Sequence, residues 1–346
     1  MKRVKRMQIL DDSREMITFD DVLIQPSYSE VRSRSDVSLS TKLSEWLSLD
    51  IPIIASNMDT VCGAQMAGAM DHLGGVGVIH RNKTHPERIR DIRALRNNNR
   101  KVGVAVGVNE LFLGPVSKYL EAGVSMIVLD IAHGDSLHAL KAIETIRNLA
   151  DRKGSAVCVV GGNVATGRAV YRMHDAGANC VKIGIGPGAA CSTRESTGVG
   201  VPQLSAIIEC AEAADSLGLS SIADGGIRSA GDVAKALAAG VDAVMLGSML
   251  AGTSEAPGGI VTVNGEHFKS YRGMASAGAG STYVEGVEGH VPFKGSASGV
   301  INTITNGLRS SFSYVGAHNL DDFRAKANFV RVSSNAVLEN GTSRIA

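Results

Sequence analysis

A single cysteine, Cys191, stands near the middle of a glycine-laden segment, IGIGPGAACSTRESTGVG (residues 183–200). A thiolate is a strong nucleophile, and a nearby cation or backbone N–H group lowers the pKa of a thiol. Ser192, Thr193 and Arg194 follow the cysteine, and the flanking glycines would let the sulfur change position. The segment therefore favours a loop that presents a nucleophile. A phosphate cradle and a turn with a buried thiol are the other interpretations.

Two glycine turns indicate a second kind of chemistry, the binding of an anion. The motif ADGGIR contains Gly225 and Gly226 after an apolar run, and LGSML repeats the arrangement with Gly247 and Ser248. Backbone N–H groups at such turns, together with a helix dipole, bind anions. Two adjacent turns predict a phosphorylated ligand, and Asp224 would then accept hydrogen bonds from a ribose diol.

Short apolar runs, which predict buried strands, alternate with helical patterns through the chain. The runs cover residues 51–56, 75–80, 101–107, 125–130, 156–162, 180–185, 220–226 and 242–248. Eight strands alternating with helices predict a (β/α)8 TIM barrel. An open, doubly wound sheet is the alternative, but SNMDTV rather than a GxGxxG motif follows the first run.

Polar residues come at the ends of these runs, where a barrel of this kind carries its active site. They are Asn57, Asp59, His80, Asp130, His133, Asn163, Cys191, Asp224 and Ser248. Residues 251–300 then form a long glycine-rich excursion. Its NG turn in VTVNGEHFKSY predicts a β-hairpin, and residues 281–295 are expected to form a flexible flap.

Composition limits the partners. The formal net charge is +1, so a small molecule is favoured over nucleic acid. Five cysteines without CxxC spacing, and histidines without ligand spacing, predict neither disulfides nor a metal centre. Residues 1–16 lack the apolar region of a secretory signal, and no apolar stretch approaches about 18 residues. We expect a soluble cytoplasmic protein without membrane contact.

Several motifs together resemble the inosine monophosphate dehydrogenase and GMP reductase family. They are MDTV, IGIGPGAACSTR, TGVGVPQ, ADGGIR, MLGS, SYRGM and GLRSS with YVGA, and the similarity runs from residue 19 to residue 332. The resemblance implies one catalytic (β/α)8 barrel over residues 1–346, assembled as a homotetramer. It also implies that Cys191 attacks C2 of a purine nucleotide to form a covalent thioimidate.

The same resemblance assigns binding residues. Those for the nucleotide are Asn57, Met58, Gly188, Ser192, Asp224, Gly225, Gly226, Gly247, Ser248, Tyr271, Gly273 and Met274. Those for a nicotinamide cofactor are Asp130, Ala132, His133, Asn163, Arg309, Ser310, Ser311 and Tyr314. Carbonyl groups at Gly184, Gly186 and Cys191 would bind a monovalent cation such as K⁺.

The two branches of the family differ in how the covalent adduct forms or resolves. The dehydrogenase oxidises IMP with NAD and hydrolyses the adduct, using an Arg-Tyr pair on a mobile flap. The reductase expels ammonia from GMP and reduces the adduct with NADPH. Here Tyr283 follows Thr282, so the pair is absent, and no regulatory CBS-type module interrupts residues 75–107. These features favour a GMP reductase. An IMP dehydrogenase without its regulatory module, or an inactive nucleotide-binding homologue, is the alternative.

Other positions either favour the dehydrogenase or depart from the pattern of the reductase or of both branches. GGVGVIHRN, the AHG after Asp130 and GIRSAGD look more like the dehydrogenase. The reductase pattern pairs a threonine, here Thr193, with a glutamate whose position is occupied by Ala277. Glu285 or Glu288 would have to replace it, and Glu285 is our candidate. Ala189 stands where both branches have a serine toward phosphate, so a modified purine nucleotide is a further candidate substrate.

Overall fold

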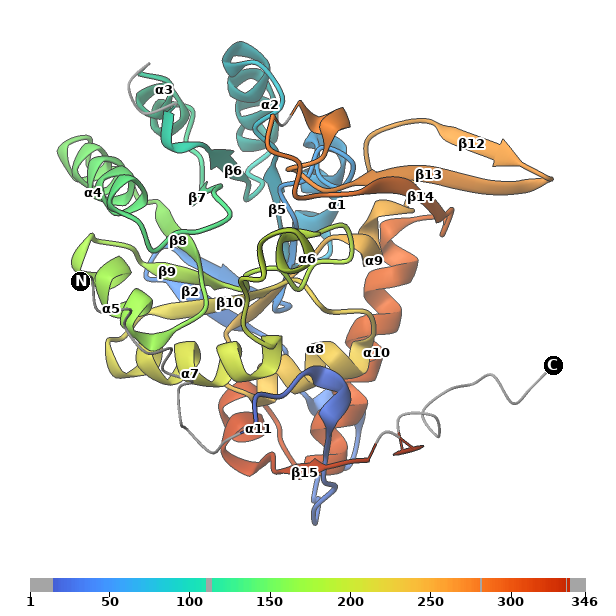
Figure 1. Ribbon diagram of the computed structural model, residues 1–346. Helices are drawn as coiled ribbons and strands as arrows, with labels where there is room; N and C mark the ends of the chain where they lie inside the picture. The colour runs from blue at the N-terminus through green and yellow to red at the C-terminus, as the bar shows by residue number, and fades with distance from the viewer. Residues whose placement is uncertain (1–14, 110–113, 281, 334, 337–346) are drawn as a thin grey trace, which may run out of the picture.

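Eight parallel strands close into a barrel in the computed structural model, which describes residues 15–109, 114–280, 282–333, 335 and 336 (Figure 1). The strands are β4 (Ile53–Ala55), β5 (Val76–Ile79), β6 (Gly103–Val106), β7 (Met126–Leu129), β8 (Cys158–Val164), β9 (Cys180–Ile183), β10 (Ser220–Asp224) and β11 (Ala243–Leu246). Each corresponds to one predicted apolar run. Strand β11 pairs with β4 to close the ring, so the predicted (β/α)8 barrel is confirmed and an open sheet is excluded.

Helices alternate with the strands, and most of them cover the outside of the barrel (Figure 1). They are α1 (Ala64–His72), α2 (His85–Asn97), α3 (Pro115–Glu121), α4 (Leu137–Arg152), α5 (Gly167–Asp175), α6 (Thr193–Thr197), α7 (Gln203–Ser216) and α8 (Ala230–Ala238). Local sequence sets their starts, because the side chains of Ser136, Thr166 and Ser229 each accept a hydrogen bond from a first-turn N–H. Between β5 and β6 the chain forms α2 and no further element.

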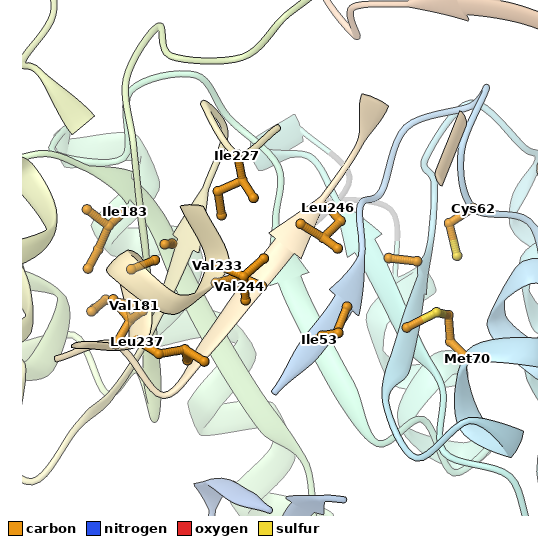
Figure 2. Packing of buried hydrophobic residues seen from close by; sticks show 14 of the residues in the cluster. Ile53, Cys62, Met70, Val181, Ile183, Ile227, Val233, Leu237, Val244 and Leu246 are labelled. Carbon is orange, nitrogen blue, oxygen red and sulfur yellow. The ribbon is translucent and has the colours of Figure 1, made fainter. Parts of the chain in front are cut away.

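Alternation along the strands divides the core into two layers. Val244 and Leu246 of β11 belong to the outer layer, in which Val233 of α8 lies next to Val244 (Figure 2). The intervening residues point inward and belong to a second cluster inside the barrel. A hairpin of β2 (Thr41–Ser44) and β3 (Leu47–Leu49) contributes leucines to that inner cluster and seals the amino-terminal end of the barrel. The hairpin does not cover the opposite end of the barrel, where the carboxyl ends of the strands lie.

Beyond β11 and the short helix α9 (Ser248–Ala251), the chain builds a three-stranded antiparallel sheet that projects to one side of the barrel (Figure 1). Its strands are β12 (Ile260–Val263), β13 (Glu266–Arg272) and β14 (Glu288–Pro292). Asn264 and Gly265 connect β12 to β13 with φ of 52° and 84°, so the predicted hairpin at the NG turn is confirmed. Of the predicted flap over 281–295, residues 288–292 form β14 and pair with β13, and residue 281 lies outside the described residues.

The remaining elements lie outside the barrel strands. They are η1 (Phe19–Asp21), β1 (Val22–Ile24), η2 (Arg34–Asp36), η4 (Ala277–Ala279), α10 (Ala297–Val315), α11 (Leu320–Lys326) and β15 (Phe329–Arg331). Within the described residues no helix combines the length and apolar character needed to cross a bilayer. Apart from its last two residues, the segment 1–16 judged not to be a secretory signal lies outside the described residues.

His80, at the end of β5, is buried, and its Nδ1 has no hydrogen-bond partner among the described residues. Burial lowers the pKa of His80 to about 4, and Lys83 and Arg88 act in the same direction against the opposing carboxylates of Asp59 and Asp91. The imidazole of the unfolded chain binds its proton below about 6.5. Between pH 6.5 and 4 the unfolded state therefore takes up a proton that the folded state does not.

We expect this difference to make the protein less stable in mild acid. The free energy of unfolding should fall by about 1.4 kcal/mol per pH unit from this group as pH decreases through that window. Urea unfolding at pH 6.5, 5.5 and 4.5 measures the effect, with His80→Asn as the comparison. The variant should lose less stability than the wild type over this range, and parallel profiles would contradict the prediction.

Candidate active site

A cavity of about 600 Å³ opens at the carboxyl ends of the barrel strands, as the polar strand ends predicted. Most sequence-predicted site residues line it. They are Asn57, Met58, Asp130, Ala132, Asn163, Gly184, Gly186, Gly188, Cys191, Thr193, Asp224, Gly225, Gly226, Gly247, Ser248, Tyr271, Gly273, Met274 and Glu285. Because they come from the carboxyl ends of six of the eight strands and from the projecting sheet with its flap, barrel closure is what brings them together.

The centre of the site is a chain of three side chains. The thiol of Cys191 donates to Oγ1 of Thr193 at 3.2 Å, and that hydroxyl donates to Oε2 of Glu285 at 2.7 Å. A proton can therefore move between sulfur and carboxylate through one hydroxyl. Ala277 is exposed in η4 and does not line the cavity. Glu285, from the other end of the same flap, supplies the carboxylate.

Backbone pairing fixes the loop that carries the thiol. Cys191 forms an isolated antiparallel bridge with Gly286. The N–H of Ser192 donates to the carbonyl of Glu285, and the N–H of Val287 donates to the carbonyl of Ala190. The loop thus joins the flap next to β14, and its position is set by these hydrogen bonds as well as by its own glycines.

Arg194 does not act as the activating cation that the sequence suggested. Its guanidinium turns under the loop, where Nε donates to the carbonyl of Ile185 at 3.2 Å and Nη2 to that of Val201 at 2.5 Å. The side chain packs against Gly186 and Gly200, where a Cβ atom would clash with it. Arg194 is thus a structural support of the loop, and the group that contacts the Cys191 thiol is the hydroxyl of Thr193.

The two glycine turns after β10 and β11 also line the cavity. Gly225 and Gly226 have φ of 93° and 78°, which favour glycine, and a Cβ on Gly225 would clash with Pro187. Ser229, in contrast, lies outside the cavity lining and caps α8. Burial, with Asp224 and Cys191 nearby, raises the pKa of Tyr271 to about 12, so its hydroxyl remains a hydrogen-bond donor.

Six predicted binding residues do not line the cavity of this chain. Ser192 begins α6, and its hydroxyl meets only Ser196. His133 is exposed beyond β7. The other four, Arg309, Ser310, Ser311 and Tyr314, lie on α10, which packs on the outside of the barrel against α8 and α1. There Arg309 donates to Val37, and the two serines donate to carbonyls of their own helix.

Asp59 also lies beside the cavity rather than in it. Its carboxylate binds Nη2 of Arg272 at 2.7 Å and Nδ2 of Asn82 at 2.9 Å. Burial by itself would raise the pKa of Asp59, but these hydrogen bonds hold it below its usual range. The backbone N–H of Arg272 also donates to Thr60, so this cluster attaches β13 to the barrel.

Sequence reasoning missed the cations of the site. Arg81, Lys182 and Arg228 line the cavity, and each is paired with an aspartate. The pairs are Arg81–Asp130 at 2.7 Å, Lys182–Asp224 at 2.5 Å and Arg228–Asp20 at 2.5 Å. A lysine at an inward position of the otherwise apolar strand CVKI was a signal that would have identified Lys182.

One of the three carbonyl groups predicted to bind K⁺ accepts a hydrogen bond within the chain. The three belong to Gly184, Gly186 and Cys191. The carbonyl of Gly184 already accepts from Nδ2 of Asn163 at 2.7 Å, and the neighbouring carbonyl of Ile185 accepts from Arg194. Among the described residues, no three His, Cys, Asp or Glu side chains come together as a metal site.

Comparison with known proteins gives a consistent picture over nearly the whole chain. Residues 16–342 match the family model of the IMP dehydrogenase / GMP reductase domain. The inosine-5′-monophosphate dehydrogenase of Cryptosporidium parvum is 37% identical over 383 aligned residues, covering 94% of each chain. That of Borreliella burgdorferi is 34% identical, covering 95% of this chain and 96% of the relative. The GMP reductase of Leishmania donovani is 31% identical over 481 aligned residues, covering 96% and 97%.

Proposed function

Because the chain belongs to the IMP dehydrogenase / GMP reductase family of purine nucleotide oxidoreductases, we propose that it is a GMP reductase. It converts GMP to IMP and ammonia with NADPH, through a thioimidate between Cys191 and C2 of the purine. We further propose that residues 1–346 act as one catalytic domain, without a regulatory module, in a cytoplasmic homotetramer.

The observation that carries this proposal is the composition of the flap between β13 and β14. Residues 273–287 contain no Arg, Lys or His, and their titratable side chains are Tyr283 and Glu285. The carboxylate of Glu285 accepts a hydrogen bond from Thr193, in line with the thiol. A proton relay to the adduct is therefore at hand, whereas the Arg-Tyr pair that dehydrogenases use to activate water is missing.

The relay has a defined part in the proposed chemistry. As the sulfur of Cys191 bonds to C2, the thiol proton passes through Thr193 to Glu285. The same path returns a proton to the 2-amino group, which leaves as ammonia and gives the thioimidate. Bound NADPH supplies the hydride that reduces C2. The C–S bond then breaks with its electron pair on sulfur, IMP is released, and a solvent proton restores the thiol.

Different parts of the cavity lining would bind the nucleotide and the cofactor. The turns at Gly225–Gly226 and Gly247–Ser248 hold the phosphate through N–H and hydroxyl groups, and Asp224 accepts from the ribose. The cavity lining also contains the apolar Ile131 and Ala132 next to Asp130 in the chain. Apolar side chains beside a carboxylate suit a nicotinamide riboside, and a cavity of about 600 Å³ is large enough for a base and a nicotinamide together.

IMP dehydrogenase is the second candidate, because several similar relatives carry that name. The missing regulatory insertion does not separate the two activities. The Leishmania donovani GMP reductase aligns over 481 residues although this chain has 346, so a reductase also contains additional residues relative to it. The flap chemistry is the feature that favours the reductase.

Two assays distinguish the candidates. The protein is incubated with GMP and NADPH, and separately with IMP and NAD, while absorbance at 340 nm and ammonia are followed. We expect absorbance to fall and ammonia to appear in the first mixture. A steady rise in the second, with none of these changes in the first, would contradict the proposal in favour of the dehydrogenase. No change in either mixture would indicate the inactive nucleotide-binding homologue.

A further inference from the structure

Lys182 is a buried cation in the wall of the barrel. It lies on β9 two residues after Cys180, whose side chain belongs to the apolar cluster inside the barrel. By strand alternation Lys182 therefore points into the interior, where it is only 4% exposed. A buried ammonium group is costly unless it is paired and hydrogen-bonded.

Its partners come from the two neighbouring strands. Nζ donates to Oδ1 of Asn163 on β8 and to Oδ2 of Asp224 on β10, both at 2.5 Å. Nδ2 of Asn163 donates to the same Oδ2 at 3.0 Å and to the carbonyl of Gly184. The amide of Asn163 is thus committed to this network, and Lys182 determines which way it faces.

The consequence for Asp224 is a carboxylate with two different oxygens. Oδ2 receives both Lys182 and Asn163, while Oδ1 has no hydrogen-bond partner among the described residues. The side chain of Asp224 is 22% exposed and lines the cavity. One oxygen is held in place, and the other is left to accept from a ligand.

The contribution of a buried ion pair to folding stability does not explain why Lys182 and Asp224 are paired here. Replacing a buried ion pair by apolar side chains of similar volume is often neutral or stabilising, so the pair is better explained by function. Most of the barrel interior is apolar and would accept methionine at this position. Both members of the pair line the cavity, so a role in binding the ligand explains the pair better than a role in stability.

We propose that Lys182 is a positioning residue that, through Asp224, makes the site selective for ribonucleotides over 2′-deoxyribonucleotides. A ribose diol gives the fixed carboxylate two donors, and a 2′-deoxyribose gives it one. Without the ammonium group the carboxylate is free to turn, and its unpaired charge repels the nucleotide phosphate. The inference rests on the proposed function only in taking the ligand to be a purine nucleotide.

The test compares binding of GMP and 2′-deoxy-GMP by calorimetry, without a cofactor, to the wild type and to Lys182→Met. The wild type should bind GMP about 10- to 100-fold more tightly, the range for one hydrogen bond to a charged group. In Lys182→Met this ratio should fall to below about threefold, mainly through weaker binding of GMP. Equal weakening of both nucleotides, or an unchanged ratio, would overturn the inference.

Two further variants separate positioning from general damage. Lys269 is a second buried lysine, 2% exposed and bonded to the carbonyls of Thr253 and Ala256 outside the cavity. Lys269→Met should lower the melting temperature but leave the ratio unchanged. The double variant Lys182→Met/Asp224→Asn removes both charges together. If Lys182 acts through Asp224, its ratio of GMP to 2′-deoxy-GMP affinity should equal that of Asp224→Asn alone.

The outcome can be separated from that of the proposed function. Binding is measured without turnover, so the result holds whether the chain reduces GMP or oxidises IMP. An unchanged ratio in Lys182→Met contradicts this inference and leaves the proposed reaction standing. If the wild type binds neither GMP nor IMP, the inference falls together with the proposed function.

Discussion

Cys191→Ser is expected to lower kcat by about 10³-fold or more, because an alcohol replaces the only nucleophile that the mechanism uses. The side chain is exposed in the cavity and makes one hydrogen bond, to Thr193, so the melting temperature should stay close to that of the wild type. Absorbance at 340 nm gives the rate, and mass spectrometry of the acid-quenched enzyme tests for a protein–nucleotide adduct.

The other four cysteines are buried and unpaired in the structure, which provides a control. Cys210 lies in α7, away from the cavity. Cys210→Ala should cost stability through lost packing while kcat stays within about twofold. If Cys191→Ser retained more than a few per cent of the wild-type rate, covalent catalysis by this residue would be excluded.

Glu285→Gln is the second large effect. We expect kcat to fall about 10²- to 10⁴-fold, the usual contribution of general acid–base catalysis, because glutamine cannot take the proton from Thr193. KM for the nucleotide should change little, since Glu285 contacts neither the phosphate turns nor Asp224. Thr193→Val breaks the same relay at its middle, so the double variant should be about as slow as the slower single variant.

Glu288 supplies the matched control. It lies three residues further along, at the start of β14, and is exposed outside the cavity lining. Glu288→Gln should leave kcat within about twofold. The reverse result, with Glu288→Gln slow and Glu285→Gln near normal, would show that the hydrogen bond from Glu285 to Thr193 is not the catalytic one.

The barrel could be predicted because its signals are local. Each apolar run is long enough to identify a strand, and Ser136 and Thr84 begin helices exactly where capping residues are expected. Register between the strands and closure through β4 and β11 are long-range properties, which followed from the expected fold rather than from any single segment.

The site was predictable in its residue types but not in its connections. Thr193 and Glu285 are 92 positions apart, and the sequence offered Glu288 equally well. The pairing of Cys191 with Gly286 decides between the two, because it brings Glu285 alongside the thiol loop. Lys182 could not be predicted as a site residue, because its partners Asn163 and Asp224 lie on neighbouring strands that the local sequence does not identify.

The residues of α10 were predicted to belong to the site, but in the structure they lie outside the cavity. Arg309 and Tyr314 were assigned to a cofactor by family resemblance alone, and that assignment does not say where their helix lies relative to the cavity. In the structure their helix lies outside the barrel, because Leu308 and Phe312 pack inward and turn the polar side chains away from the cavity. Assignment by motif located the segment but not its relation to the pocket.

The pairing of each cation lining the cavity with an aspartate affects how a nucleotide arrives. A cavity lined with unpaired cations would extend its field into solvent over about a Debye length, roughly 8 Å at physiological ionic strength, and would speed the approach of anions. Here the charges cancel within each pair, so little field extends beyond the mouth. Discrimination among anions consequently begins only at contact, where the turn N–H groups meet the phosphate, and added salt should leave the rate of encounter almost unchanged.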